Sequence, residues 1–176
     1  DRDLRLVYRT TLPYQQIQEY CATLASSPLQ IVRPSTLRKK IRISESAQQN
    51  LLHALESIFL VRRIPVEGDY KGDLFWFEDQ IERNHFSLNP ISHPDEADWI
   101  TLIYRNARAQ FNYRVGELPR YFHYRTRGGA QVPLGIQNSD GILGLIGVQT
   151  KTDIDRSLKS SADSFLKNYN HSKVIF

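Results

Sequence analysis

The chain has 176 residues, of which 40% are hydrophobic and 24% are charged, which is enough apolar material for one large domain or two small ones. This composition excludes collagen and disordered chains, and the single cysteine, Cys21, excludes a disulfide scaffold. Charged residues interrupt every long apolar run, so we expect neither a membrane span nor a membrane partner. A lone cysteine favours a reducing compartment, the cytoplasm. The sequence starts at Asp1, has no Met and has no signal-peptide pattern, so we expect a piece of a longer polypeptide.

The first half of the chain predicts three helices followed by a hairpin. Apolar residues recur at helical spacing over 12–25, Pro34 begins a short helix over 34–41, and Ser44 caps a third helix whose apolar side extends to Phe59. Strand-like runs over 59–65 and 74–77 flank turn residues at 67–69. This order is typical of a winged helix-turn-helix, which we assign to residues 1–88.

The second half predicts one sheet with two helices. Residues 87–94 include Pro90 and Pro94 and lack apolar periodicity, so we place the domain boundary there. The predicted elements are a helix over 95–111, strands over 120–126, 130–137 and 142–149, a helix over 158–169 and a strand over 173–176. Tight-turn residues between the three strands favour antiparallel neighbours. The order α, β, β, β, α, β is that of the PD-(D/E)xK nuclease-like (restriction-endonuclease-like) fold, which we assign to residues 89–176. The whole chain is then of the α+β or α/β class.

Three segments sharpen this interpretation: ALESIFLVRRIP, YFHYRTRGGAQVPLGI and GILGLIGVQTK. Over about residues 3 to 176 the chain resembles the C-terminal region of a family of bacterial and archaeal AAA+-type ATPases of uncharacterised function. The resemblance implies that a winged helix and a nuclease-like domain follow an ATPase domain. The chain has no Gly-Lys-Ser or Gly-Lys-Thr for a phosphate loop, so no cofactor is expected here. ATP and magnesium are expected only in an upstream domain.

The nuclease chemistry of this fold needs two acidic groups that hold a divalent metal, and a lysine. The resemblance places Pro133 at the position of the metal-binding aspartate, and Gly147 and Gln149 at the positions of the second acid and the lysine. A shift by two residues puts Gln149 and Lys151 at the acid and lysine positions instead, and Asp98 lies where the family often has a glutamate. A second carboxylate would have to come from Asp140 or Asp153, which fit a turn and a cap better. We therefore expect no catalysis and no metal, with Asp98, Gln149 and Lys151 as weak candidates.

Basic residues gather just before the third helix. The net charge is only +4, but no acid interrupts the cations between Arg33 and Arg42, so this segment is either a phosphate contact or a solvated helix face. In a helix-turn-helix the second helix of the motif enters the major groove, where glutamine and asparagine can pair with adenine. The expected contacts with DNA are Arg33, Arg38, Lys39, Lys40, Arg42, Gln48, Gln49, Asn50, Arg62 and Arg63, with Glu45, His53 and Lys71 as further candidates.

The aromatic residues over 121–124 alternate along a predicted strand between Arg120, Arg125 and Arg127, an arrangement that can stack on bases. The same alternation is typical of a sheet with one packed and one solvated face. The five histidines show no metal-ligand spacing, and Cys21 is expected to be a buried apolar residue.

Three hypotheses of function follow. The first is a non-catalytic accessory region of an AAA+-type ATPase that binds nucleic acid or orients the motor, with the upstream ATPase domain as its partner. The second is a protein interaction scaffold, which the mild net charge favours. The third is a metal-dependent nuclease with a rearranged site at Gln149 and Lys151.

Overall fold

The computed structural model describes residues 10, 12–27, 31–70, 73–87, 94–113, 119–145, 147 and 156–175. The chain is of the mixed α+β class, as predicted, and forms two compact units. The first unit is Asp1–Arg63 with Gly72–His93, and the second is Ile64–Lys71 with Pro94–Phe176. Among the described residues, no helix has both the length and the apolar character needed to cross a membrane.

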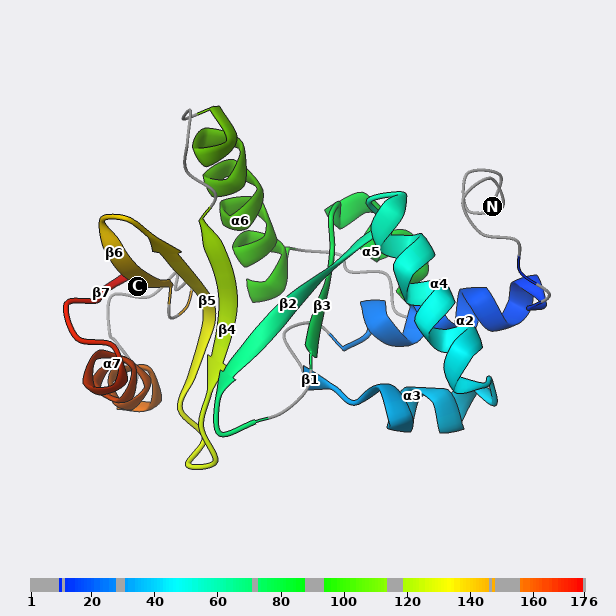
Figure 1. Ribbon diagram of the computed structural model, residues 1–176, viewed down its shortest axis with the longest axis horizontal. Helices are drawn as coiled ribbons and strands as arrows, with labels where there is room; N and C mark the ends of the chain where they lie inside the picture. Colours follow the sequence, from blue (N-terminus) through cyan, green and yellow to red (C-terminus); the bar gives the residue numbers. More distant parts are fainter. Residues whose placement is uncertain are drawn as a thin grey trace. The chain divides into compact units, whose positions relative to one another are not determined.

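The first unit consists of helices around a small antiparallel sheet (Figure 1). Its elements are α2 (Tyr14–Ala25), β1 (Ile31–Val32), α3 (Pro34–Ile41), α4 (Glu45–Ser57), the beginning of β2 (Val61–Gly68), β3 (Asp73–Phe77) and α5 (Gln80–Phe86). The helices predicted over 12–25, over 34–41 and after Ser44 are confirmed as α2, α3 and α4. The short elements β1 and α5 were missed by the sequence analysis.

Local signals set the boundaries of the helices that carry the basic segment. Pro34 is the first residue of α3, where its missing N–H costs no hydrogen bond. The helix ends at Arg42, which has a left-handed conformation with φ of 59°. The hydroxyl of Ser44 then accepts a hydrogen bond of 3.2 Å from the backbone N–H of Ala47 and caps α4. Only Arg42, Ile43 and Ser44 therefore separate the two helices.

The core of the first unit joins α2, α3 and α4 to the sheet. The apolar faces of the helices and strands bury the following residues: Ile17, Tyr20, Cys21, Leu24, Leu37, Ile41, Leu51, Leu55, Val61, Phe75 and Phe77. Cys21 is buried and free, and burial raises its pKa to about 12. The prediction that this thiol is an apolar core residue is confirmed, because a protonated buried thiol is a poor nucleophile.

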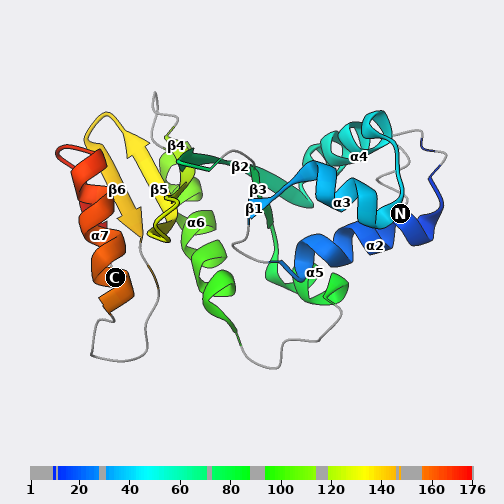
Figure 2. The same ribbon diagram turned by 90° about the horizontal axis from the view of Figure 1, so that it is seen from below.

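The second unit is a sheet with one helix on each face. Its elements are the end of β2, α6 (Glu96–Tyr113), β4 (Arg120–Arg125), β5 (Gln131–Asn138), β6 (Gly141–Leu145), α7 (Arg156–Asn168) and β7 (Lys173–Ile175). The predicted order α, β, β, β, α, β is thus found from α6 to β7. Strands β4, β5 and β6 are antiparallel neighbours, whereas β2 joins β4 and β7 joins β6 in parallel. The two views of the ribbon place α6 and α7 on opposite faces of β4 and β5 (Figures 1 and 2).

Alternation along β4 separates these two faces. Phe122 and Tyr124 point toward α7, where their rings lie 6.3 Å and 5.5 Å from the ring of Phe165. Tyr121 points the other way, toward α6, and its ring lies 4.9 Å from that of Tyr104. The strand partner of Phe122 is Gly135, where a Cβ would lie 2.4 Å from the Phe122 ring. Gly135 therefore provides the space in which this ring packs.

Candidate nucleic-acid interface

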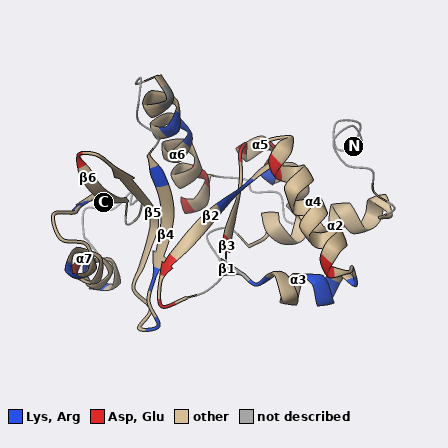
Figure 3. Ribbon diagram, viewed as in Figure 1, with Lys and Arg blue, Asp and Glu red and all other residues tan. Residues whose placement is uncertain are grey.

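Three cations lie together at the C-terminal end of α3. Lys39 and Lys40 occupy its last turn and Arg42 follows it, and all three are exposed. Figure 3 shows basic residues at this end of α3. Within the described part of the chain, none of them has an ion pair. We call these three residues the basic end of α3. Cations at this end also interact favourably with the helix dipole, so the helix itself tolerates the cluster.

The other basic residues predicted for the interface are placed differently. Arg33 precedes α3 and lies at the opposite end of this helix, about 12 Å along its axis for 8 residues. Arg38 pairs with Glu45, which links the last turn of α3 to the first turn of α4. Arg62 pairs with Glu78 through an Nε to Oε1 distance of 2.5 Å.

Arg63 also has acidic neighbours. Its guanidinium lies 3.7 Å from Glu56 and 3.8 Å from Asp73, and it stands 5.7 Å from the centre of the Phe75 ring. The charges of Arg38, Arg62 and Arg63 are therefore matched by carboxylates within the unit. The sequence could not show this, because the acids that match the last two come from other elements.

The exposed face of α4 carries Gln49, Asn50 and His53, which lie about one and two turns after the start of this helix at Glu45. Amide side chains in such a position can pair with a base edge. Arg42, Ile43 and Ser44 connect the two helices, so the first residue of α4 closely follows the basic end of α3. Gln49, however, lines a pocket with Ser35 of the first turn of α3, and the neighbouring Gln48 donates to the Pro34 carbonyl oxygen, so this part of α4 lies beside the start of α3. The described contacts do not bring the amide residues to the basic end of α3.

Gln48 is a correction to the predicted interface, because its side chain belongs to the core. It is 2% exposed, and its Nε2 donates to Tyr20 Oη at 3.1 Å and to the Pro34 carbonyl oxygen at 2.9 Å. Gln48 therefore ties α4 to α2 and to the start of α3 and does not face solvent. The periodicity contained a signal for this, since Gln48 is three, four and seven residues before Leu51, Leu52 and Leu55, on the buried face of the helix.

A pocket of about 170 Å³ lies between the first turn of α3 and one side of α4, with Ser35, Gln49 and Leu52 among its lining residues. Ligand pockets for drug-sized molecules have volumes of about 300–1,000 Å³. This one is too small for such a molecule, and the ion pair of Arg38 and Glu45 occupies part of its wall. We assign it no ligand of its own.

The residues considered for a nuclease centre belong to the second unit, and Asp98 is the first of them. Asp98 is 3% exposed, and its Oδ2 accepts a hydrogen bond of 3.1 Å from the N–H of Asp95. The N–H of Asp98 donates in return to Asp95 Oδ1 at 2.9 Å. This reciprocal pair is a capping box at the start of α6. Gln149, Lys151 and Asp153 lie outside the described residues, and no group of three possible metal ligands occurs among those described.

Pro133 lies at an irregularity of the sheet. Between the pairs Phe122 with Gly135 and Tyr124 with Val132, β5 has one more residue than β4, which is a β-bulge. A proline is tolerated there because the bulge interrupts the ladder that would need its N–H. Opposite the bulge, Nδ1 of His123 lies 3.1 Å from the Pro133 carbonyl oxygen.

His123 is fully buried, and its Nε2 has no hydrogen-bond partner among the described residues. Burial lowers the pKa of its imidazole to about 4, an effect that the hydrogen bond with Pro133 opposes and the charge of Arg125 reinforces. The side chain is therefore neutral near pH 7. Among the described residues, no group of possible metal ligands includes this imidazole.

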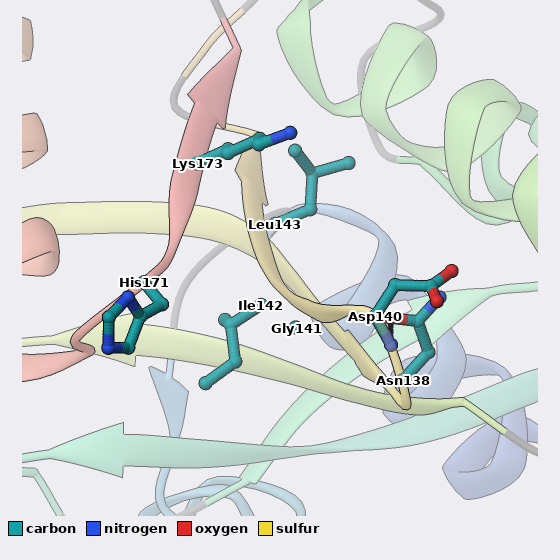
Figure 4. A pocket seen from close by; sticks show the side chains of 7 residues that line it. All are labelled: Asn138, Asp140, Gly141, Ile142, Leu143, His171 and Lys173. Atoms are coloured by element: carbon teal, nitrogen blue, oxygen red, sulfur yellow. Dashed lines mark hydrogen bonds between the residues drawn. The ribbon is translucent and has the colours of Figure 1, made fainter.

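A second pocket, of about 180 Å³, lies at the turn between β5 and β6 and includes Asp140, His171 and Lys173 in its lining. Asp140 is in the turn, where its N–H donates to Asn138 Oδ1 at 3.0 Å, as the sequence predicted for a turn residue. Figure 4 shows His171 on one side of the pocket and Asn138 with Asp140 on the other, while the Lys173 amine extends past Leu143. These side chains do not converge on a common point, so they do not form a catalytic group.

Comparison of the chain with protein-family models, with curated proteins and with solved structures gives no match.

Proposed function

We propose that this chain binds duplex nucleic acid through the first unit. The basic end of α3 contacts backbone phosphates, and Gln49 and Asn50 on α4 face the base edges. The observation that carries this proposal is the exposure of Lys39, Lys40 and Arg42 at the junction of α3 and α4, without an ion pair among the described residues. Phosphate contacts supply most of the affinity of such proteins, and base contacts supply the specificity.

The arrangement of the first unit supports a winged helix-turn-helix. Its order is α2, β1, α3, α4, β2, β3, and β1 pairs with β3 through Ile31 with Leu74 and Val32 with Asp73. In this fold α3 and α4 are the two helices of the motif and α4 is the recognition helix. The acidic residues that neutralise Arg62 and Arg63 limit the contribution of β2 to binding.

We infer further that the second unit is a nuclease-like domain without activity, in the accessory region of an AAA+-type ATPase. The order α, β, β, β, α, β and the segments quoted above support this inference. Two of the positions that would carry metal ligands hold Pro133 and Gly147. Asp98 caps α6 through its hydrogen bonds with Asp95, and this structural role accounts for its burial without a metal ion.

The test of nucleic-acid binding is a salt titration with a fluorescent duplex. Three phosphate contacts from the basic end of α3 predict a slope of log affinity against log salt of about −2.7. The double change Lys39→Ala with Lys40→Ala makes the slope shallower by about 1.8 units. The matched control removes two exposed lysines of α7, Lys159→Ala with Lys167→Ala, and leaves the slope unchanged.

The two amide residues of α4 have a different signature. Gln49→Ala or Asn50→Ala reduces the discrimination between duplexes of different sequence by about 1–3 kcal/mol and leaves the salt slope unchanged. If the full chain binds no nucleic acid at low salt, or if the lysine change and its control behave alike, this proposal is wrong.

A protein interaction scaffold is the second candidate, and one observation favours it. Helix α6 exposes Trp99, Leu102 and Ile103, which are 44%, 40% and 37% exposed and lie at helical spacing on one side. Contiguous apolar side chains at a surface are typical of protein contacts. In this case Trp99→Ser weakens the association of the chain with an upstream ATPase domain while the lysine change does not.

A further inference from the structure

The last residues of β2 and β4 are paired in the second unit. Gly68, the last residue of β2, pairs with Arg125, the last residue of β4. Its φ is +99°, and a Cβ at this position would lie 2.4 Å from the Arg125 carbonyl oxygen. The N–H of Asp69 donates to that same oxygen at 3.1 Å. Only glycine allows this approach, which places the chain after β2 against the β4–β5 turn.

A second set of bonds fixes the turn itself. Asp69 Oδ2 accepts a hydrogen bond of 3.0 Å from the backbone N–H of Arg127. The turn closes through Thr126, whose N–H donates to the Ala130 carbonyl oxygen at 2.9 Å and whose Oγ1 accepts from the Ala130 N–H at 3.2 Å. The backbone that carries Arg127 is therefore held from both sides.

Two arginines extend from this fixed backbone. Arg125 is half-buried, with its guanidinium 5.2 Å from the centre of the Tyr70 ring, and Arg127 is exposed beside Gly128 and Gly129. Neither arginine has an ion pair with a described residue. The nearby acid Asp69 directs an oxygen to the backbone of Arg127. Figure 3 shows basic residues at the β4–β5 turn.

From this geometry we infer a second nucleic-acid contact, in which Arg125 and Arg127 bind two backbone phosphates at the β4–β5 turn. We call Tyr70, Arg125 and Arg127 the hairpin contact. An arginine that stacks on a tyrosine keeps the N–H groups at its edge available to an anion and has less side-chain freedom to lose on binding. The contact rests on the proposed function, because it needs a ligand with phosphates in series.

The test is the same salt titration with the full chain. Arg125→Gln with Arg127→Gln makes the slope shallower by about 1.8 units, and Arg127→Gln alone by about 0.9. The matched control, Lys159→Gln with Lys167→Gln, removes the same charge from the exposed side of α7 and leaves the slope unchanged. Circular dichroism and urea unfolding of each variant show whether the second unit is intact.

A change at Asp69 is expected to increase the affinity for the duplex, a result that damage to the fold would not produce. Asp69→Asn keeps an oxygen that can accept from the Arg127 N–H and removes the negative charge beside both arginines. Binding to the duplex then tightens about two- to fivefold at low salt. Loss of affinity in this variant, or no change in it, overturns the hairpin contact.

The outcomes separate this inference from the proposed function. If Lys39→Ala with Lys40→Ala lowers the slope and Arg125→Gln with Arg127→Gln does not, the first unit binds and the hairpin contact is wrong. The reverse result supports the hairpin contact and refutes the role of the basic end of α3. A chain that binds neither duplex nor single strand refutes both.

Discussion

Replacement of Gln48 by methionine separates the two roles that this residue could have. Methionine has nearly the same length and a high helix propensity, so the change removes the amide and little else. It leaves the Pro34 carbonyl oxygen and the Tyr20 hydroxyl without the donor that they now share, at 2.9 Å and 3.1 Å. A buried polar group without its partner costs about 1–3 kcal/mol, so two of them lower the free energy of unfolding by about 2–6 kcal/mol.

The matched control is the neighbouring residue, Gln49→Met, on the exposed face of α4. Surface changes of this kind alter stability by less than about 0.5 kcal/mol. Urea unfolding is followed by the fluorescence of Trp76, which is buried in β3 of the same unit. The reasoning is refuted if Gln48→Met is as stable as the unchanged chain and loses its preference between duplex sequences, because Gln48 would then contact bases.

Three more predictions concern the second unit. Burial lowers the pKa of His123 from its ordinary 6.5 to about 4. Between these two pH values the imidazole is protonated in the unfolded chain and neutral in the folded chain, so the free energy of unfolding falls as the pH drops from 6.5 to 4. This loss is about 3 kcal/mol at most, and His123→Leu removes it, as urea unfolding across this pH range measures. Gly135→Ala lowers stability by about 1–3 kcal/mol, because its methyl group meets the Phe122 ring, and Phe122→Leu in the same chain recovers part of the loss in a double-mutant cycle. Asp98→Ala lowers the free energy of unfolding by about 0.5–2 kcal/mol, because the change removes a helix cap. Calorimetry with magnesium or manganese detects no binding, either in the unchanged chain or in this variant. A micromolar metal affinity that Asp98→Ala abolishes would contradict this prediction.

Periodicity and capping residues were sufficient to predict most of the elements. The helices α2, α3, α4, α6 and α7 each have an apolar face at helical spacing, and such faces are a property of the local sequence. Ser44 and Pro34 mark helix starts for reasons that involve only the next few residues. Burial of Cys21 followed from its place on the apolar face of α2.

Elements whose stability comes from distant partners were not predictable in this way. Strand β1 has two residues and exists because Ile31 and Val32 pair with β3, about forty residues later in the chain. The parallel pairing of β2 with β4 likewise joins segments that no turn connects. Pairing partners of this kind are chosen by the whole fold, because a single strand has no preference for one neighbour over another.

The candidate interface shows the same division at the level of side chains. The sequence alone identified the basic residues between Arg33 and Arg42 and placed them before α4. Only the tertiary structure showed that Gln48 is a core residue, that Glu78 neutralises Arg62, and that Tyr70 stacks on Arg125. Composition determines how many charges and amides a chain has. Which of them remain available to a ligand depends on partners that folding brings from other elements, since burial and pairing are properties of the three-dimensional surroundings.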